Sequence, residues 1–180
     1  QHVLTTRRGI PITLALLFIE IAQQIGLDAR PVSFPGHFLI KLKMPQGEVV
    51  IDPFNGRSLS RDDLEERIEP YRRRHGLVGD AEVPLGLFLQ TATPRAVVAR
   101  MLRNLKEIHR GAEEWPALLA VMQRLVILLP DDWDERRDRG LVRAELGDDD
   151  GALQDLAAYV EHSPGADDVR AINDRIGELR

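Results

Sequence analysis

The stretch that decides the fold is HVLTTRRGIPITLALLFIEIAQQIGLDARPVSFPGHFLIKL, residues 2–42. Apolar side chains fill residues 11–25 with almost no polar face before Glu20, so we expect a helix that is buried on most sides. Pro11 suits the first turn of this helix, because the N–H that proline lacks would have no helical partner there. Gly26 is the candidate residue to end it.

The residues after this helix alternate between strand and turn signals. The expected strands, separated by Pro35-Gly36 and by the turn at 44–47, are residues 29–34, 37–43 and 48–51. If Lys43 pairs with Glu48 across the turn, Leu39 lies opposite Asp52, and His37 is two positions along on the same face.

This register makes His37 and Asp52 diagonal neighbours within side-chain reach, and we expect a hydrogen bond between them. A histidine oriented by a carboxylate is the base half of a nucleophilic triad, because the carboxylate fixes the tautomer and stabilises the imidazolium. The alternative is an ordinary half-buried strand histidine, with Asp52 capping the turn through Pro53.

Three stretches carry a family resemblance: RRGIPITLALLFIEIAQQIGL, PGHFLIKL and VVIDPFNG. They resemble the transglutaminase-like family of SirB-type bacterial proteins, which pair this domain with C-terminal tetratricopeptide repeats. The resemblance is specific over residues 4 to about 60 and looser over the remainder.

The resemblance also implies site residues. In the wider transglutaminase-like and papain-like superfamily a helix begins Gly-x-Cys-x-x-x-Ala, a histidine starts a later strand and an aspartate lies on the next. Gly9 and Ala15 match the flanking positions, His37 and Asp52 match the histidine and the aspartate, and Pro11 stands at the cysteine. The implied triad therefore lacks its nucleophile.

No other hydroxyl is well placed to replace it. Thr13 lies two residues along the helix, a rotation of about 200° that turns it away from the Pro11 face. Ser33 would need a distorted loop, and Thr5 and Thr6 would need the segment before the helix to fold back. Because a catalytic hydroxyl must lie about 3 Å from its base, we do not expect catalysis.

The vacated position has a second interpretation as an anion site. A helix that begins at a proline presents backbone N–H groups and the positive end of its dipole to that position. The residues expected to hold a carboxylate there are Arg7, Arg8, Ile12, Thr13 and His37. The alternative is that the proline ring and neighbouring apolar side chains fill the space.

Composition excludes several other classes of function. There are no cysteines, and the five histidines lack a short metal-ligand spacing, so we expect no metal and no cofactor. A net charge of −5 opposes nucleic-acid binding, and we expect the basic cluster at residues 72–75 to be a solvated helix face. No apolar run reaches about 18 residues, so we expect a cytoplasmic protein with no membrane association. Because the chain begins with Gln1, we expect it to be an excerpt of a longer protein.

The C-terminal half carries a repeat. Gly140, Ala152 and Pro164 fall at positions 8, 20 and 32 of a tetratricopeptide unit that begins at Trp133, and Pro130 lies 34 residues before Pro164. The preceding unit, at about residues 99–132, is degenerate. Its usual Gly and Ala positions hold Lys106 and Leu118. Residues 167–180 would cap the stack.

The sequence therefore predicts an α+β fold: a transglutaminase-like helix and antiparallel sheet at residues 1–93, then an all-α tetratricopeptide-like region at 94–180. The expected function is a non-catalytic interaction or regulatory protein that binds a protein or peptide partner. The alternative is a hydrolase or acyltransferase of the transglutaminase or cysteine-protease type with an unorthodox nucleophile. The helical region is either a peptide-binding groove or an extension that only completes the fold.

Overall fold

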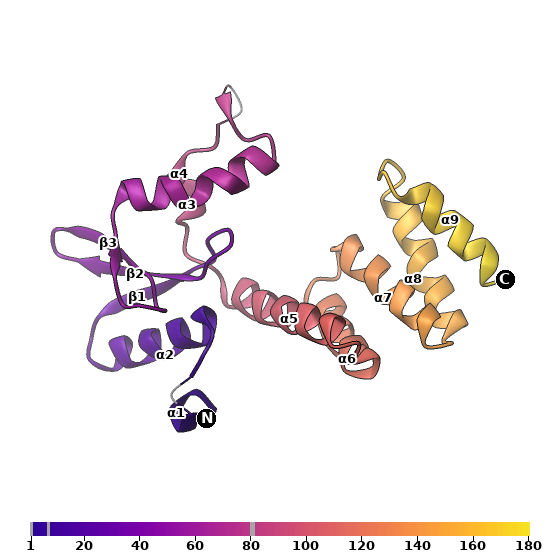
Figure 1. Ribbon diagram of the computed structural model, residues 1–180, viewed down its shortest axis with the longest axis horizontal. Coiled ribbons are helices and arrows are strands. Elements are labelled where there is room, and N and C mark those ends of the chain that lie inside the picture. The colour runs from indigo at the N-terminus through magenta and orange to yellow at the C-terminus, as the bar shows by residue number, and fades with distance from the viewer. Residues whose placement is uncertain (1, 7, 80–81) are drawn as a thin grey trace. The chain divides into compact units, whose positions relative to one another are not determined.

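The structure, a computed structural model, describes residues 2–6, 8–79 and 82–180. The chain divides into two compact units, Gln1–Val97 and Val98–Arg180. The first combines helices with a small antiparallel sheet and the second is helical (Figure 1). The described elements are, in chain order, α1 (His2–Thr6), α2 (Pro11–Gln24), β1 (Asp28–Val32), β2 (Leu39–Met44), β3 (Gly47–Ile51), β4 (Ser58–Leu59), α3 (Arg61–Arg74), α4 (Leu85–Phe88), α5 (Pro94–Gly111), α6 (Trp115–Leu128), α7 (Trp133–Glu145), α8 (Asp149–His162) and α9 (Val169–Glu178). The α+β fold class that the sequence predicts is confirmed.

Helix α2 begins and ends where its sequence indicates. Ile10 is the N-cap residue in extended backbone, and Pro11 is the first helical residue. Ile25 is the C-cap, and Gly26 follows with a φ of +82°, the left-handed conformation that glycine adopts most readily. Proline and glycine therefore fix both ends of the helix.

The sheet has the strand order β1-β2-β3-β4, and neighbouring strands are antiparallel. Lys43 pairs with Glu48, which confirms the expected register. The strand ends differ from expectation, because residues 34–37 form a turn. In this turn the His37 N–H donates to the Phe34 carbonyl at 3.0 Å, and Gly36 has a φ of +72°. The turn keeps His37 out of the strand, so β2 begins only at Leu39.

Helices cover the two faces of the sheet, with α2 on one side and α3 and α4 on the other (Figure 1). The face toward α3 and α4 carries one buried apolar cluster, which consists of Val32, Phe34, Leu39, Val50, Leu64, Ile68 and Leu85. Ala29 and Ile40 are also buried and have the opposite strand parity, so they face α2. The sheet is thus the middle layer of the first unit.

The expectation that α2 is buried on most sides is wrong. Only the stripe that faces the sheet is buried, and it consists of Ile12, Ala15, Ile19 and Ala22. Phe18, Ile21 and Ile25 are 38%, 51% and 70% exposed. The apolar pattern of the helix is correct, but the described residues leave a second apolar face uncovered.

Helix α3 also corrects one expectation. Ser60 and Asp63 form a capping box, in which the Ser60 hydroxyl accepts from the Asp63 N–H at 3.1 Å. Arg73 pairs with Glu69 on the solvated face, as the sequence predicts. Arg72, however, is buried, and it donates to Glu65 at 2.7 Å and to the Val83 carbonyl at 2.8 Å. It ties the segment after α3 to the helix.

The second unit is a stack of helices, and small residues at the repeat positions let neighbouring helices approach closely. A Cβ atom on Gly140 of α7 would lie 2.9 Å from the Leu156 side chain of α8, so only glycine permits this approach of the two helices. Ala152 is fully buried. Helix α9 packs against α8 through the buried Ile172 and Ile176. Of the described helices, not one has the length and apolar character that crossing a bilayer requires.

Candidate functional site

The start of α2 holds the position that the resemblance assigns to a nucleophile. Pro11 occupies the first helical position, and its side chain offers no group that can attack a substrate. Gly9 is needed for packing here, since a Cβ atom on it would lie 2.8 Å from the Thr13 hydroxyl and 3.0 Å from Leu14. The glycine thus lets the chain pass close to the first turn of the helix.

The nearest hydroxyl on the helix already has a partner. The Thr13 Oγ1 donates to the Ile10 carbonyl at 2.9 Å, and the Thr13 backbone N–H donates to the same carbonyl at 3.0 Å. An anion site here would need the Thr13 N–H to lack an intrahelical partner, so this premise of the anion hypothesis is wrong for Thr13. Neither group of Thr13 is directed at an external ligand.

His37 is the exposed last residue of the turn before β2. Its backbone N–H closes that turn, as described above, and β2 begins two residues later at Leu39. The imidazole ring is therefore accessible to solvent and to a ligand.

Asp52 is bound by groups other than His37. It follows the last residue of β3 and is only 7% exposed. One carboxylate oxygen accepts from Arg67 Nη1 of α3 at 2.9 Å, and the other accepts from the Phe54 N–H at 3.0 Å. Among the described residues, no hydrogen bond joins His37 and Asp52, so the expected bond is not formed. A guanidinium from α3 neutralises the carboxylate that would have oriented the histidine.

The remaining residues of the anion hypothesis are only partly described. Arg7 lies outside the described residues. Arg8 is exposed, and its backbone N–H donates to the Thr6 hydroxyl at 3.3 Å. Ile12 is buried against the sheet. Within residues 2–6, 8–79 and 82–180, no group of three histidine or carboxylate side chains could hold a metal ion.

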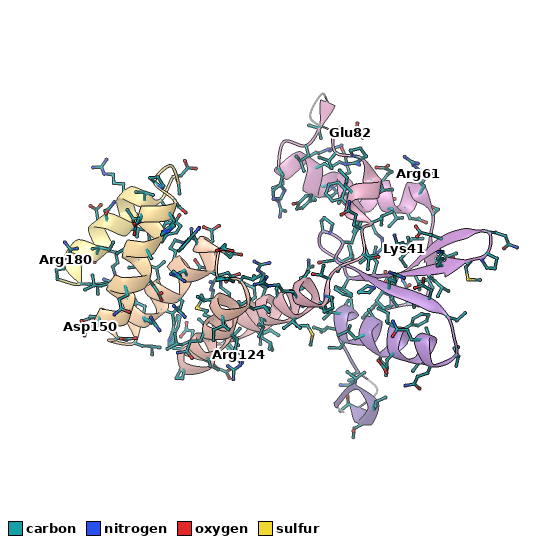
Figure 2. All side chains as sticks on the ribbon, turned by 180° about the vertical axis from the view of Figure 1, so that it is seen from behind. Lys41, Arg61, Glu82, Arg124, Asp150 and Arg180 are labelled. Carbon is teal, nitrogen blue, oxygen red and sulfur yellow. The ribbon has the colours of Figure 1, made fainter. Side chains whose placement is uncertain are left out.

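A polar hollow of about 260 Å³ lies elsewhere, on the sheet. Its lining residues are Asp28, Arg30, Lys41, Lys43, Glu48 and Thr91. Arg30 pairs with Asp28 at 2.7 Å and Lys41, labelled in Figure 2, pairs with Glu48 at 3.3 Å. The hydrogen bond from Arg30 lowers the pKa of Asp28 below its ordinary value. The period-two alternation of charges along β1 and β2 was visible in the sequence, but sequence reasoning missed this hollow.

In the helical unit, ion pairs join α5 to α7. Lys106, at the degenerate Gly position, is buried, and its ammonium donates to Glu135 at 2.6 Å and to Asp138 at 2.6 Å. Arg103 also binds Glu135, at 2.7 Å. We call these residues, together with Asp132 and Arg110, the Lys106 cluster. Its charges pair with one another, so the cluster holds α5 and α7 together.

Comparisons with known proteins agree with this architecture. Residues 1–103 match the family model of the transglutaminase-like superfamily, and residues 105–177 match a tetratricopeptide repeat model. A UPF0162 protein of Xylella fastidiosa (strain Temecula1) is 36% identical over 182 residues, which is 99% of this chain and 63% of the relative. The UPF0162 protein YchA of Escherichia coli K12 is 31% identical over 168 residues, which is 91% of this chain and 59% of the relative.

A third relative, the UPF0162 protein PA3419 of Pseudomonas aeruginosa, is 30% identical over 177 residues, with 63% of its length covered. The chain thus spans less than two thirds of the length of these curated relatives. Helix α2 and the sheet lie within the first matched region, and α6, α7 and α8 lie within the second. The chain therefore belongs to the transglutaminase-like superfamily, with a tetratricopeptide repeat region after the transglutaminase-like part.

Proposed function

We propose that this protein is a non-catalytic member of the transglutaminase-like superfamily, of the SirB type, that binds a protein or peptide partner. The observation that carries the proposal is the first turn of α2. Pro11 stands where the resemblance places the nucleophile, and the Thr13 hydroxyl is engaged by the Ile10 carbonyl at 2.9 Å.

The rest of the triad positions support the same proposal. The Asp52 carboxylate is bound by Arg67 at 2.9 Å, so it is not available to orient an imidazole. His37 lies exposed at the turn before β2. A base without a nucleophile and without its orienting carboxylate lacks the arrangement that acyl transfer requires.

Binding is the function that the remaining surface favours. Tetratricopeptide repeats typically mediate protein interactions, and residues 105–177 match such a model. We propose that the boundary between the two functional parts lies at residues 93/94, where α5 begins. The vacated site of the first part and the repeat face of the second both contribute to recognition of the partner. We propose that the protein acts in the cytoplasm, the compartment expected from its sequence.

Of the residues expected to bind an anion, Arg8 and His37 are the two described residues that could still contact one. Because the Thr13 N–H is engaged, a partner's carboxylate would depend on the charge of Arg8 and on a hydrogen bond from His37. Titration with acidic peptides, followed on the His37 ring by NMR, tests this part. We expect a shift that is lost in Arg8→Ala; no shift at millimolar peptide, or the same shift in Arg8→Ala, excludes it.

Crosslinking tests the binding function as a whole. Benzoylphenylalanine at Phe54, which is exposed beside Asp52, reports on the first unit, and the same group at Leu105 on α5 reports on the helical unit. We expect one protein partner to be captured from at least one of these positions, and the purified partner to bind the unsubstituted chain in a defined ratio. Failure of every captured protein to bind when purified contradicts the proposal.

A further inference from the structure

Helix α2 carries two apolar stripes. The first faces the sheet and consists of residues spaced by three, four and three: Ile12, Ala15, Ile19 and Ala22. The second consists of residues spaced by four, three and four: Leu14, Phe18, Ile21 and Ile25. At about 100° per residue the two stripes point roughly 110° apart, so the sheet cannot cover both.

The second stripe, which we call the outer seam, has the pattern of a helix–helix contact. Alternate spacings of three and four place side chains in one line along a helix, the arrangement by which a second helix packs. Leu14 is partly buried, and exposure rises along the seam to 70% at Ile25. Single exposed apolar residues are common, but a continuous apolar line over three turns indicates an interaction surface.

The length of the relatives indicates what covers this seam. The matched region is 63% of the Xylella fastidiosa relative and 59% of the Escherichia coli one, so more than a third of each relative lies outside it. We propose that a helix from this additional part of the polypeptide packs along the outer seam. The inference concerns the first unit alone and does not rest on the proposed function.

The size of the seam favours a covalently linked helix over a second copy of the chain. From Leu14 to Ile25 the seam is only about 16 Å long, at about 1.5 Å per residue. Such a strip from each of two copies falls short of the roughly 1,000 Å² that a stable dimer interface needs. A helix in the same polypeptide meets the seam at a high effective concentration, so a contact of this size suffices.

Site-specific crosslinking identifies the occupant. The protein is a chimera in which residues 1–180 replace the matched region of the Xylella fastidiosa relative, with benzoylphenylalanine at Phe18. We expect crosslinks within one molecule, to a peptide from outside residues 1–180. The matched control is the same group at Glu20, which lies on the far side of the helix and should give less than a tenth of that yield. Crosslinks from Phe18 between two copies, to residues 98–180, or to no peptide at all overturn the proposal.

A second measurement needs no chimera. Carbene footprinting compares the 180-residue chain with the full-length Xylella fastidiosa relative, each as it is. We expect strong labelling of residues 18–25 in the shorter chain and at least fivefold weaker labelling of the corresponding helix in the full-length relative. Equal labelling of the two helices overturns the proposal even if the chimera does not fold.

Discussion

The ammonium group of Lys106 lies 2.6 Å from the carboxylate of Glu135, and both residues are 5% exposed. Lys106 stands at the position where a tetratricopeptide repeat usually has glycine. The lysine joins α5 to α7 through charge, whereas Gly140, at the same position of the regular unit, lets α7 approach α8 closely.

Lys106→Met should lower the free energy of unfolding by about 2–3 kcal/mol. Removal of one partner of a buried ion pair typically costs 3–5 kcal/mol, but Arg103 still binds Glu135 and reduces the loss. Urea unfolding followed by circular dichroism measures the change. Arg175→Ala, which removes ion pairs on the solvated face of α9, is the control and should cost less than about 1 kcal/mol. Equal costs for the two variants would mean that burial gives the Lys106 pair no additional weight.

Asp138→Asn should make stability less sensitive to acid. Burial acts to raise the pKa of Asp138, but hydrogen bonds from Lys106 and Arg137 outweigh it and hold this pKa below its ordinary value. The ionised carboxylate therefore stabilises the fold above the unfolded-state pKa of about 3.9, and this contribution is lost as pH falls through the lower folded-state pKa.

Unfolding free energies at pH 7, 5 and 3 test this sign. The deficit of Asp138→Asn relative to the unsubstituted chain should be largest at pH 7 and should shrink below pH 4. Asp150→Asn alters an exposed carboxylate on α8, labelled in Figure 2, and is the control with a small effect throughout. A deficit for Asp138→Asn that grows on acidification contradicts the assignment.

Gly140→Ala should destabilise the chain by about 1–3 kcal/mol, because the new methyl group would lie 2.9 Å from Leu156. Gly177→Ala in α9 is the matched control, since a Cβ atom there meets nothing within 4 Å. The control should be neutral or should stabilise by up to about 1 kcal/mol, the helix propensity difference between the two residues. Thermal unfolding of both variants measures this contrast, and similar melting temperatures would contradict the tight α7–α8 contact.

Much of the first unit could be predicted from local sequence. Pro11 and Gly26 mark the ends of α2 through backbone chemistry that needs no tertiary context. The short turn at residues 44–47 sets the pairing of Lys43 with Glu48. These predictions succeeded because proline, glycine and a hairpin turn restrict the chain within a few residues.

The contacts of the candidate site could not be predicted in this way. Arg67 reaches Asp52 from α3, and no local pattern showed that this guanidinium would take the place of His37. The sequence places Arg72 in a run of solvated charges. In the structure, however, the segment that contains Val83 folds over this side chain and binds it. Likewise, the apolar pattern of α2 predicted a helix buried on most sides but did not show that the described residues cover only one of its two apolar stripes.

Paired substitutions on α2 should separate these two stripes. Ile19→Ala should cost about 2–4 kcal/mol, because Ile19 is buried against the sheet. Ile21→Ala removes the same atoms from a half-exposed position and should cost less than about 1 kcal/mol in the 180-residue chain. Urea unfolding of the two variants under one set of conditions gives the comparison. Equal losses would mean that both stripes are covered within these 180 residues.

The most direct test of the central claim is a turnover assay on the unsubstituted protein with amide, ester and glutamine-donor substrates. Because Pro11 supplies no nucleophile and Arg67 binds the Asp52 carboxylate, we predict rates at background, and no labelling by electrophilic probes for serine and threonine. Pro11→Cys and His37→Ala are measured beside it, the first to restore the missing thiol and the second to remove the base. Reproducible turnover by the unsubstituted protein that His37→Ala abolishes would contradict the claim that this member of the superfamily is non-catalytic.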